Sequence, residues 1–157
     1  MSLKNISTNT LKARHINIMA IIKSYTDLEQ SKKLSEILPL ESADMYYAGH
    51  QSIINPKEWE YGDRPKTRGK YISFDDKRIF YPCWSLAALL DIMPNSENIS
   101  TNLSKGGYRI STLEYTNSWF VDYEDETNGL NNCVTSSDNP VDACYEMILK
   151  LHEQNIL

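Results

Sequence analysis

The sequence predicts an α+β fold, a single domain in which about three α-helices pack against a meander of antiparallel β-hairpins. Three observations lead to this class. The chain has 157 residues, which is the length of one ordinary domain. Helical spacing of apolar residues recurs along the chain, with strand-like segments between the helical ones. No strand–helix–strand alternation is long enough to build a parallel sheet.

Composition and charge exclude several classes of protein. Hydrophobic residues make up 41% of the chain, which is enough for a core and excludes an intrinsically disordered protein. There are 16 Lys and Arg against 21 Asp and Glu, so the net charge is -5. This charge repels phosphate backbones and anionic lipid surfaces. We therefore expect no bulk nucleic-acid binding and no membrane partner.

The N-terminal residues show no targeting pattern. Residues 1–10 are polar, and the apolar stretch over residues 16–22 is about seven residues long. That length is short for a signal peptide and far short of a membrane span. We expect a cytoplasmic protein in which residues 1–18 form a loose extension and residues 19–157 form the domain.

The first predicted element is a helix that begins at Thr26 and that Pro39 ends. Thr26 and Glu29 have the spacing of a capping box, and proline is a helix stop. The apolar side of this helix consists of Leu28, Leu34, Ile37 and Leu38.

The segment after this helix predicts one strand and two loops. Residues 45–47 predict a short strand, and residues 53–60 predict a loop or turn. Residues 62–70 are basic and are interrupted by Pro65 and Gly69, which predicts an exposed loop.

A hairpin and a second helix are predicted next. Residues 70–74 and 78–81 are rich in strand formers, and the turn residues 75–77 separate them, so we expect a hairpin with aromatic cross-strand contacts. Residues 84–93 predict a helix. Its signals are a cap at Ser85, apolar residues at Leu86, Leu89, Leu90 and Met93, and a stop at Pro94.

A loop and a second hairpin are predicted before the last helix. Residues 95–107 are rich in Ser and Asn and predict a loop. Residues 108–115 and 119–124 predict a hairpin around a turn at residues 116–118, with one face wetter than the other. Trp119, Val121 and Tyr123 alternate with Phe120, Asp122 and Glu124.

The last predicted helix has the clearest signals. Asn139 is a preferred cap residue, and Pro140 occupies the first helical position, where its missing N–H costs nothing. One apolar stripe follows at helical spacing, formed by Val141, Cys144, Tyr145, Ile148 and Leu151.

The three cysteines predict reduced thiols. They are far apart and form no C-x-x-C pair, which argues against a disulfide framework and against a four-ligand zinc site. Cys83 and Cys144 lie in apolar segments, so we expect them to be buried. Cys133 lies among polar residues in a predicted loop.

One basic and aromatic region is the candidate binding site. Its four cations lie within residues 62–70, but the glycine spacing does not fit a phosphate-binding P-loop. Arg and aromatic side chains together suit a phosphate and a stacked base, or an acidic protein partner, and a solvated loop is the alternative. The candidate residues are Tyr46, Tyr47, Trp59, Tyr61, Arg64, Lys66, Arg68, Lys70 and Tyr71.

Catalytic and metal-binding signals are weaker. The acidic run Asp122, Glu124, Asp125 and Glu126 lacks the ligand order of a calcium loop, so we predict no metal and no cofactor. Of the three histidines, His50 is the one that we consider for a catalytic role.

Three segments carry a resemblance. PLESADMYY at residues 39–47, YPCWSLAALLDIMP at residues 81–94 and DNPVDACYEMILKLH at residues 138–152 resemble small proteins carried by phages and mobile elements of gut anaerobic bacteria. The resemblance covers roughly residues 20–154 and brings no known activity. It implies a setting in which small effectors bind a host protein or sequester a signalling nucleotide.

Three functional hypotheses follow. The first is a non-enzymatic interaction protein, for example an inhibitor that binds a host defence factor. The second is a sponge for a phosphorylated small molecule, with a site formed across a homo-oligomer interface. The third is a small hydrolase that uses His50 and the acidic run.

Overall fold

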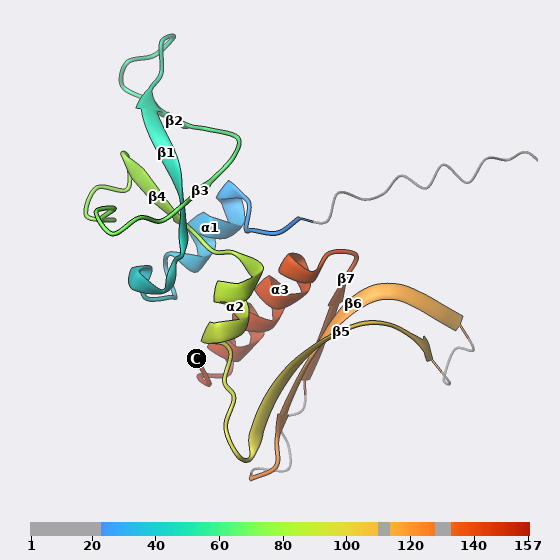
Figure 1. Ribbon diagram of the computed structural model, residues 1–157. Coiled ribbons are helices and arrows are strands. Elements are labelled where there is room, and N and C mark those ends of the chain that lie inside the picture. The colour runs from blue at the N-terminus through green and yellow to red at the C-terminus, as the bar shows by residue number, and fades with distance from the viewer. Residues whose placement is uncertain (1–22, 110–113, 128–132) are drawn as a thin grey trace, which may run out of the picture.

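The computed structural model describes residues 23–109, 114–127 and 133–157, which form three α-helices and two antiparallel β-sheets (Figure 1). The predicted α+β class is therefore confirmed, as one domain. The prediction for residues 1–18 lies outside the described residues. Within the described residues, no helix combines the length and the apolar character that crossing a bilayer requires.

Strand β1 (Met45–Gln51) organises the first sheet. It pairs antiparallel with β2 (Trp59–Tyr61), β3 (Lys66–Thr67) and β4 (Phe80–Cys83). The predicted strand at residues 45–47 is confirmed and extends further than expected.

The predicted hairpin of residues 70–74 and 78–81 is wrong. β4 pairs with β1 instead, and the Ile72 N–H donates to the carbonyl of Gly69 within a turn. Phe74 is buried in the core rather than aligned in a strand. Core burial of this ring and pairing with β1 outweigh the local strand propensity of residues 70–74.

The second sheet has the order β5 (Ile99–Arg109), β6 (Glu114–Asp125), β7 (Cys133–Ser137). The loop predicted at residues 95–107 is wrong, because most of it forms β5. The loop predicted around Cys133 is wrong as well, because Cys133 begins β7.

The turn predicted at residues 116–118 is also wrong, since these residues lie inside β6. Lys105 pairs with Trp119 and Gly107 pairs with Thr116, so β6 has one more residue than β5 between the two pairs. The turn-forming residues therefore mark a β-bulge, which accommodates the extra residue without ending the strand.

The two faces of the second sheet differ as expected. Val121 and Tyr123 are buried against the core, whereas Glu124, on the other face, is exposed. Helix α3 (Pro140–Glu153) contacts both β6 and β7 (Figure 1). The apolar stripe of this helix is thus buried against the inner face of the sheet.

The helices α2 (Leu86–Ile92) and α3 confirm their predictions. Ser85 accepts from the backbone N–H of Ala88, and Asn139 accepts from that of Val141. The two helices contact each other, and their side chains Leu89, Met147, Ile148 and Leu151 are fully buried.

Helix α1 (Leu28–Leu34) differs from its prediction at both ends. The capping box is formed by Asp27 and Gln30, one residue later than predicted. The helix ends at Leu34, and Pro39 instead precedes a 3₁₀ turn over Leu40–Ser42.

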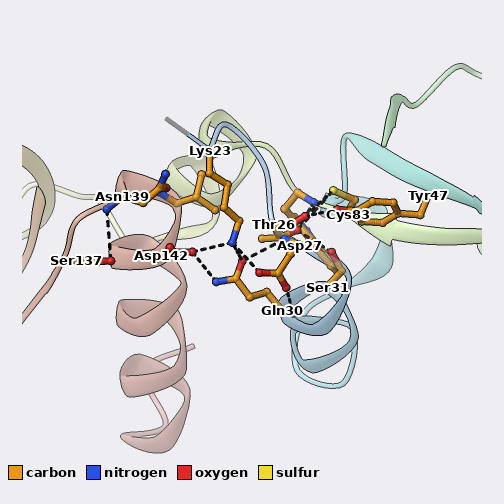
Figure 2. A network of polar contacts seen from close by, with 12 residues as sticks. Lys23, Thr26, Asp27, Gln30, Ser31, Tyr47, Cys83, Ser137, Asn139 and Asp142 are labelled. Atoms are coloured by element: carbon orange, nitrogen blue, oxygen red, sulfur yellow. Dashed lines mark hydrogen bonds and ion pairs between the residues drawn. The ribbon is translucent and has the colours of Figure 1, made fainter. Parts of the chain in front are cut away.

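Thr26 is not a cap because it is used inside the core. Its side chain is fully buried, and Oγ1 lies 2.8 Å from Ser31 Oγ and accepts from the Trp84 N–H at 3.1 Å (Figure 2). The Thr26 carbonyl accepts from the Tyr47 hydroxyl at 2.7 Å. Of the residues described, no buried side-chain N or O lacks a hydrogen-bond partner.

Lys23 ties the start of α1 to the start of α3 (Figure 2). Its ammonium lies 2.8 Å from Asp27 Oδ2 and 2.8 Å from Asp142 Oδ1. Gln30 also donates to Asp142 Oδ1, at 2.7 Å. These contacts join segments that are more than a hundred residues apart in the chain.

Acid is expected to weaken this network through Asp27. Burial raises the pKa of Asp27, but hydrogen bonds from the Gln30 amide and the Lys23 ammonium outweigh burial and lower the pKa below 3.8. A carboxylate whose pKa is lowered by folding stabilises the fold above its unfolded pKa. That stabilisation is lost as the pH falls through the folded pKa.

Asp27→Asn keeps a capping side chain and removes the charge. We expect this variant to be less stable than wild type by about 0.5 kcal/mol at neutral pH, because 55% of the Asp27 side chain is exposed and screened. Urea unfolding of both proteins should show the difference shrinking as the pH is lowered from about 5 to about 2. A difference that stays constant over this range would contradict the prediction.

Candidate functional site

Two of the predicted binding residues are parts of the core. Tyr47 is 4% exposed, and burial, followed by the nearby Cys83, raises the pKa of its hydroxyl. Tyr46 packs on the core with its ring edge-to-face against Phe80, at 5.2 Å between centroids. Because neighbouring residues of a strand point to opposite faces, these two tyrosines do not share a surface.

The predicted basic loop is anchored rather than free. Arg68 donates to the carbonyls of Glu41, Ala43 and Ile72, and its guanidinium lies 4.6 Å from the Phe74 ring centroid. This arginine therefore holds the loop on the core. Of the other members, Lys66 lies in β3, and Arg64, Lys70 and Tyr71 are exposed.

Trp59 and Tyr61 do lie together, on one face of the first sheet. Tyr61 is paired with Gly49 and Trp59 with Gln51, so both rings lie on the same side of β1 as Tyr47. Tyr81, which is paired with Tyr47, shares that face. The Tyr61 and Tyr81 rings meet edge-to-face at 5.5 Å between centroids.

A turn at residues 75–79 adds two cations to these rings. The Tyr61 hydroxyl donates to the Lys77 carbonyl at 2.8 Å, which fixes the turn beside the ring. Lys77 Nζ lies 5.8 Å from the Tyr81 ring centroid, and Arg78 Cζ lies 5.8 Å from the Trp59 ring centroid. The end of α1 adds Lys32, near Tyr61 and Tyr81. We name this set the aromatic–basic surface: Lys32, Trp59, Tyr61, Lys77, Arg78 and Tyr81.

The charges of the aromatic–basic surface are largely paired within the chain. Arg78 binds Asp76 through Nε at 2.9 Å and Nη2 at 2.8 Å, and these hydrogen bonds lower the pKa of Asp76. Lys32 Nζ lies 2.6 Å from Glu29 Oε1. Burial, followed by the nearby Tyr81, raises the pKa of Tyr61, so this phenol stays neutral. The surface thus offers aromatic contact within a rim of paired charges.

Comparison of the chain with protein-family profiles, with curated proteins and with solved structures gives no match. Evidence for a function of this chain therefore comes from its side chains and from how the fold places them.

The residues considered for catalysis lie in different sheets. His50 Nε2 lies 3.6 Å from Glu60 Oε2 across β1 and β2, and both side chains are more than half exposed. Asp122, Glu124 and Asp125 lie in β6 of the second sheet, far from this pair in Figure 1. In the described part of the chain, no group of three or more His, Cys, Asp or Glu is placed to hold a metal ion.

Two shallow grooves each include an aspartate side chain that the fold already uses. One, of about 480 Å³, lies between β7 and α3 and includes Asp142, which binds Lys23 and Gln30. The other, of about 360 Å³, includes Asp44, which binds the backbone N–H and hydroxyl of Ser85.

Sequence reasoning missed four members of the aromatic–basic surface, namely Lys32, Lys77, Arg78 and Tyr81. The sequence predicts a tight turn at Lys77 and a strand that begins at Arg78 and ends at Tyr81. The adjacent pair Lys77 and Arg78, three residues before Tyr81, is a weak signal. Only the pairing of β4 with β1 shows that these residues lie beside Trp59 and Tyr61.

Proposed function

We propose that the chain works without catalysis, by binding a partner protein through the aromatic–basic surface. The partner class suggested by the resemblance to mobile-element proteins is a protein of the host cell. Tyr, Trp and Arg are the residues that contribute most strongly to protein interfaces.

One observation carries the proposal: Tyr61 and Tyr81 are partly exposed and yet held in place, beside the partly exposed Trp59. The Tyr61 hydroxyl is bound to the Lys77 carbonyl, and the Tyr81 hydroxyl lies 3.1 Å from Ser35 Oγ. Rings that are already ordered lose little conformational entropy when a partner covers them. This supports a role in binding beyond filling the core.

The paired charges favour a protein over a phosphorylated small molecule. Arg78 already has two of its donors on Asp76, and Lys32 is paired with Glu29. A phosphate would compete with these carboxylates for Lys32 and Arg78, whereas a protein surface can cover the pairs as a polar rim.

The test compares two aromatic truncations. Trp59→Ala removes a ring of the aromatic–basic surface, and Tyr71→Ala removes a ring that is 92% exposed and lies outside it. The immobilised protein is used to capture a partner from an extract of its own host cells, and affinity is then measured by calorimetry with the purified partner. We expect Trp59→Ala to weaken binding about 30-fold, which corresponds to about 2 kcal/mol. Tyr71→Ala should bind like wild type.

Two outcomes would contradict the proposal. One is an equal affinity for wild type and Trp59→Ala when both have the same melting temperature. The other is a small-molecule adduct in native mass spectrometry that survives buffer exchange in wild type and is lost in Trp59→Ala. The adduct would support the sponge hypothesis instead.

A further inference from the structure

The loop between β1 and β2 presents two adjacent isoleucines to solvent. Ile53 is 95% exposed and Ile54 is 94% exposed. Of the other large hydrophobic side chains described, only Tyr71 is similarly bare. Single exposed apolar residues are ordinary, but two neighbours at the end of a projecting hairpin form a local apolar tip (Figure 1). We name residues 52–58 the hairpin tip.

The hairpin tip is ordered by its own hydrogen bonds. The Ser52 N–H donates to the Glu58 carbonyl at 2.9 Å, and the Glu58 N–H donates to the Asn55 carbonyl at 2.9 Å. Asn55 Nδ2 donates to Glu58 Oε1 at 2.7 Å, and Gln51 Nε2 donates to the Pro56 carbonyl at 2.8 Å. These hydrogen bonds hold the loop, and they leave the two isoleucine side chains almost fully exposed.

The isoleucines contribute little to the fold. Exposed side chains bury no apolar area in the folded chain. Almost all of the apolar area of these two side chains is therefore still available for burial by a binding partner. The loop geometry is maintained by Ser52, Asn55 and Glu58, which are all polar. The tip is therefore a preformed projection whose apolar end has no partner among the described residues.

A protein pocket suits this tip better than a bilayer. Two isoleucines have about eight side-chain carbons, fewer than one myristoyl chain, which binds membranes only marginally by itself. The net charge of -5 also repels anionic lipid. In a protein interface the tip does not act alone, because Trp59 of the aromatic–basic surface follows it directly in β2.

We infer that Ile53 and Ile54 insert as an aliphatic anchor into an apolar pocket of the partner protein. The inference rests on the proposed function and names the chemistry of the pocket that the partner must supply. The aromatic–basic surface then covers the rim beside that pocket, since two of its rings, Trp59 and Tyr61, belong to the same hairpin as the tip.

The test is a matched pair of double variants of the full chain. Ile53→Ser/Ile54→Ser removes the apolar tip, whereas Ile53→Leu/Ile54→Leu keeps its apolar area. Because both positions are exposed, melting temperatures should stay within about 2 °C of wild type. With the partner captured from host extract and then purified, the Ser pair should bind at least about 100-fold more weakly. The Leu pair should bind within about tenfold of wild type.

Photo-crosslinking locates the pocket independently of affinity. A benzophenone side chain placed at position 54 should crosslink to apolar side chains that line a cavity of the partner. Crosslinks confined to polar surface residues would overturn the inference. So would flotation of wild type, but not of the Ser pair, with phosphatidylcholine vesicles, because the tip would then be a membrane anchor.

The variants separate failure of the inference from failure of the proposed function. If Trp59→Ala weakens binding and the Ser pair does not, the inference of an isoleucine anchor is wrong, and the proposal that the aromatic–basic surface binds the partner is supported. If the Ser pair weakens binding and Trp59→Ala does not, the anchor stands and that surface is wrong. If wild type captures no protein, both are wrong.

Discussion

Replacing Gly49 with alanine is expected to lower the free energy of unfolding by about 3 kcal/mol, at the upper end of the usual cost of overpacking. A Cβ at this position would lie 1.8 Å from the Arg78 carbonyl oxygen and 3.2 Å from Tyr61 Cε1. The Gly49 N–H also donates to the Ile79 carbonyl at 2.8 Å, so the turn cannot move away without breaking the bond. Glycine is thus needed here for close approach of the 75–79 turn to β1.

Gly62→Ala is the matched control for Gly49→Ala. A Cβ at Gly62 meets nothing within 4 Å, so we expect its unfolding free energy to stay within about 0.5 kcal/mol of wild type. Urea unfolding followed by tryptophan fluorescence measures both variants. Equal stability of the two would contradict the close approach at Gly49. Because Arg78 and Tyr61 flank the clash, Gly49→Ala should also weaken partner binding.

Thr26→Val is expected to destabilise the protein by about 3 kcal/mol. Valine has nearly the shape of threonine but no hydroxyl, so the Trp84 N–H and the Ser31 hydroxyl would lose their partner in a fully buried site. Each buried polar group left without a partner costs roughly 1–3 kcal/mol. The hydrogen bond from the Tyr47 hydroxyl to the Thr26 carbonyl is retained in this variant. The loss of stability therefore measures the contribution of the Thr26 hydroxyl.

Thr26→Ser is the control for Thr26→Val. Serine keeps the hydroxyl and loses one methyl group, for which we expect a cost of about 1 kcal/mol. Equilibrium urea unfolding of the three proteins gives the comparison. If Thr26→Val is as stable as Thr26→Ser, the hydroxyl of Thr26 does not stabilise the fold, and the prediction for this buried site is wrong.

Elements with local signals were predictable from the sequence. Ser85 marks the start of α2 and Pro94 follows its end, and Asn139 and Pro140 mark the start of α3. These signals can be recognised in the sequence because cap residues and prolines act on the adjacent backbone. The alternation of Val121 and Tyr123 with polar neighbours likewise identified the buried face of β6.

Elements that depend on distant partners were not predictable. Residues 70–74 have strand propensity, but they do not pair with β4. Instead β4 pairs with β1, and Phe74 is buried in the core. Residues 95–107 have loop composition, yet most of them pair with β6 over a long register. In each case pairing and burial across the chain outweigh local preference.

The candidate site divides in the same way. The sequence by itself determined the α+β class and the second and third helices, and it included Trp59 and Tyr61 among the candidate binding residues. Only the tertiary structure decided that Tyr47 is core, that Arg68 is an anchor and that Arg78 and Tyr81 join Trp59 on one face. The reason is that caps and periodicity are set by neighbours in the chain, whereas a surface is set by strand register, which joins residues far apart in sequence.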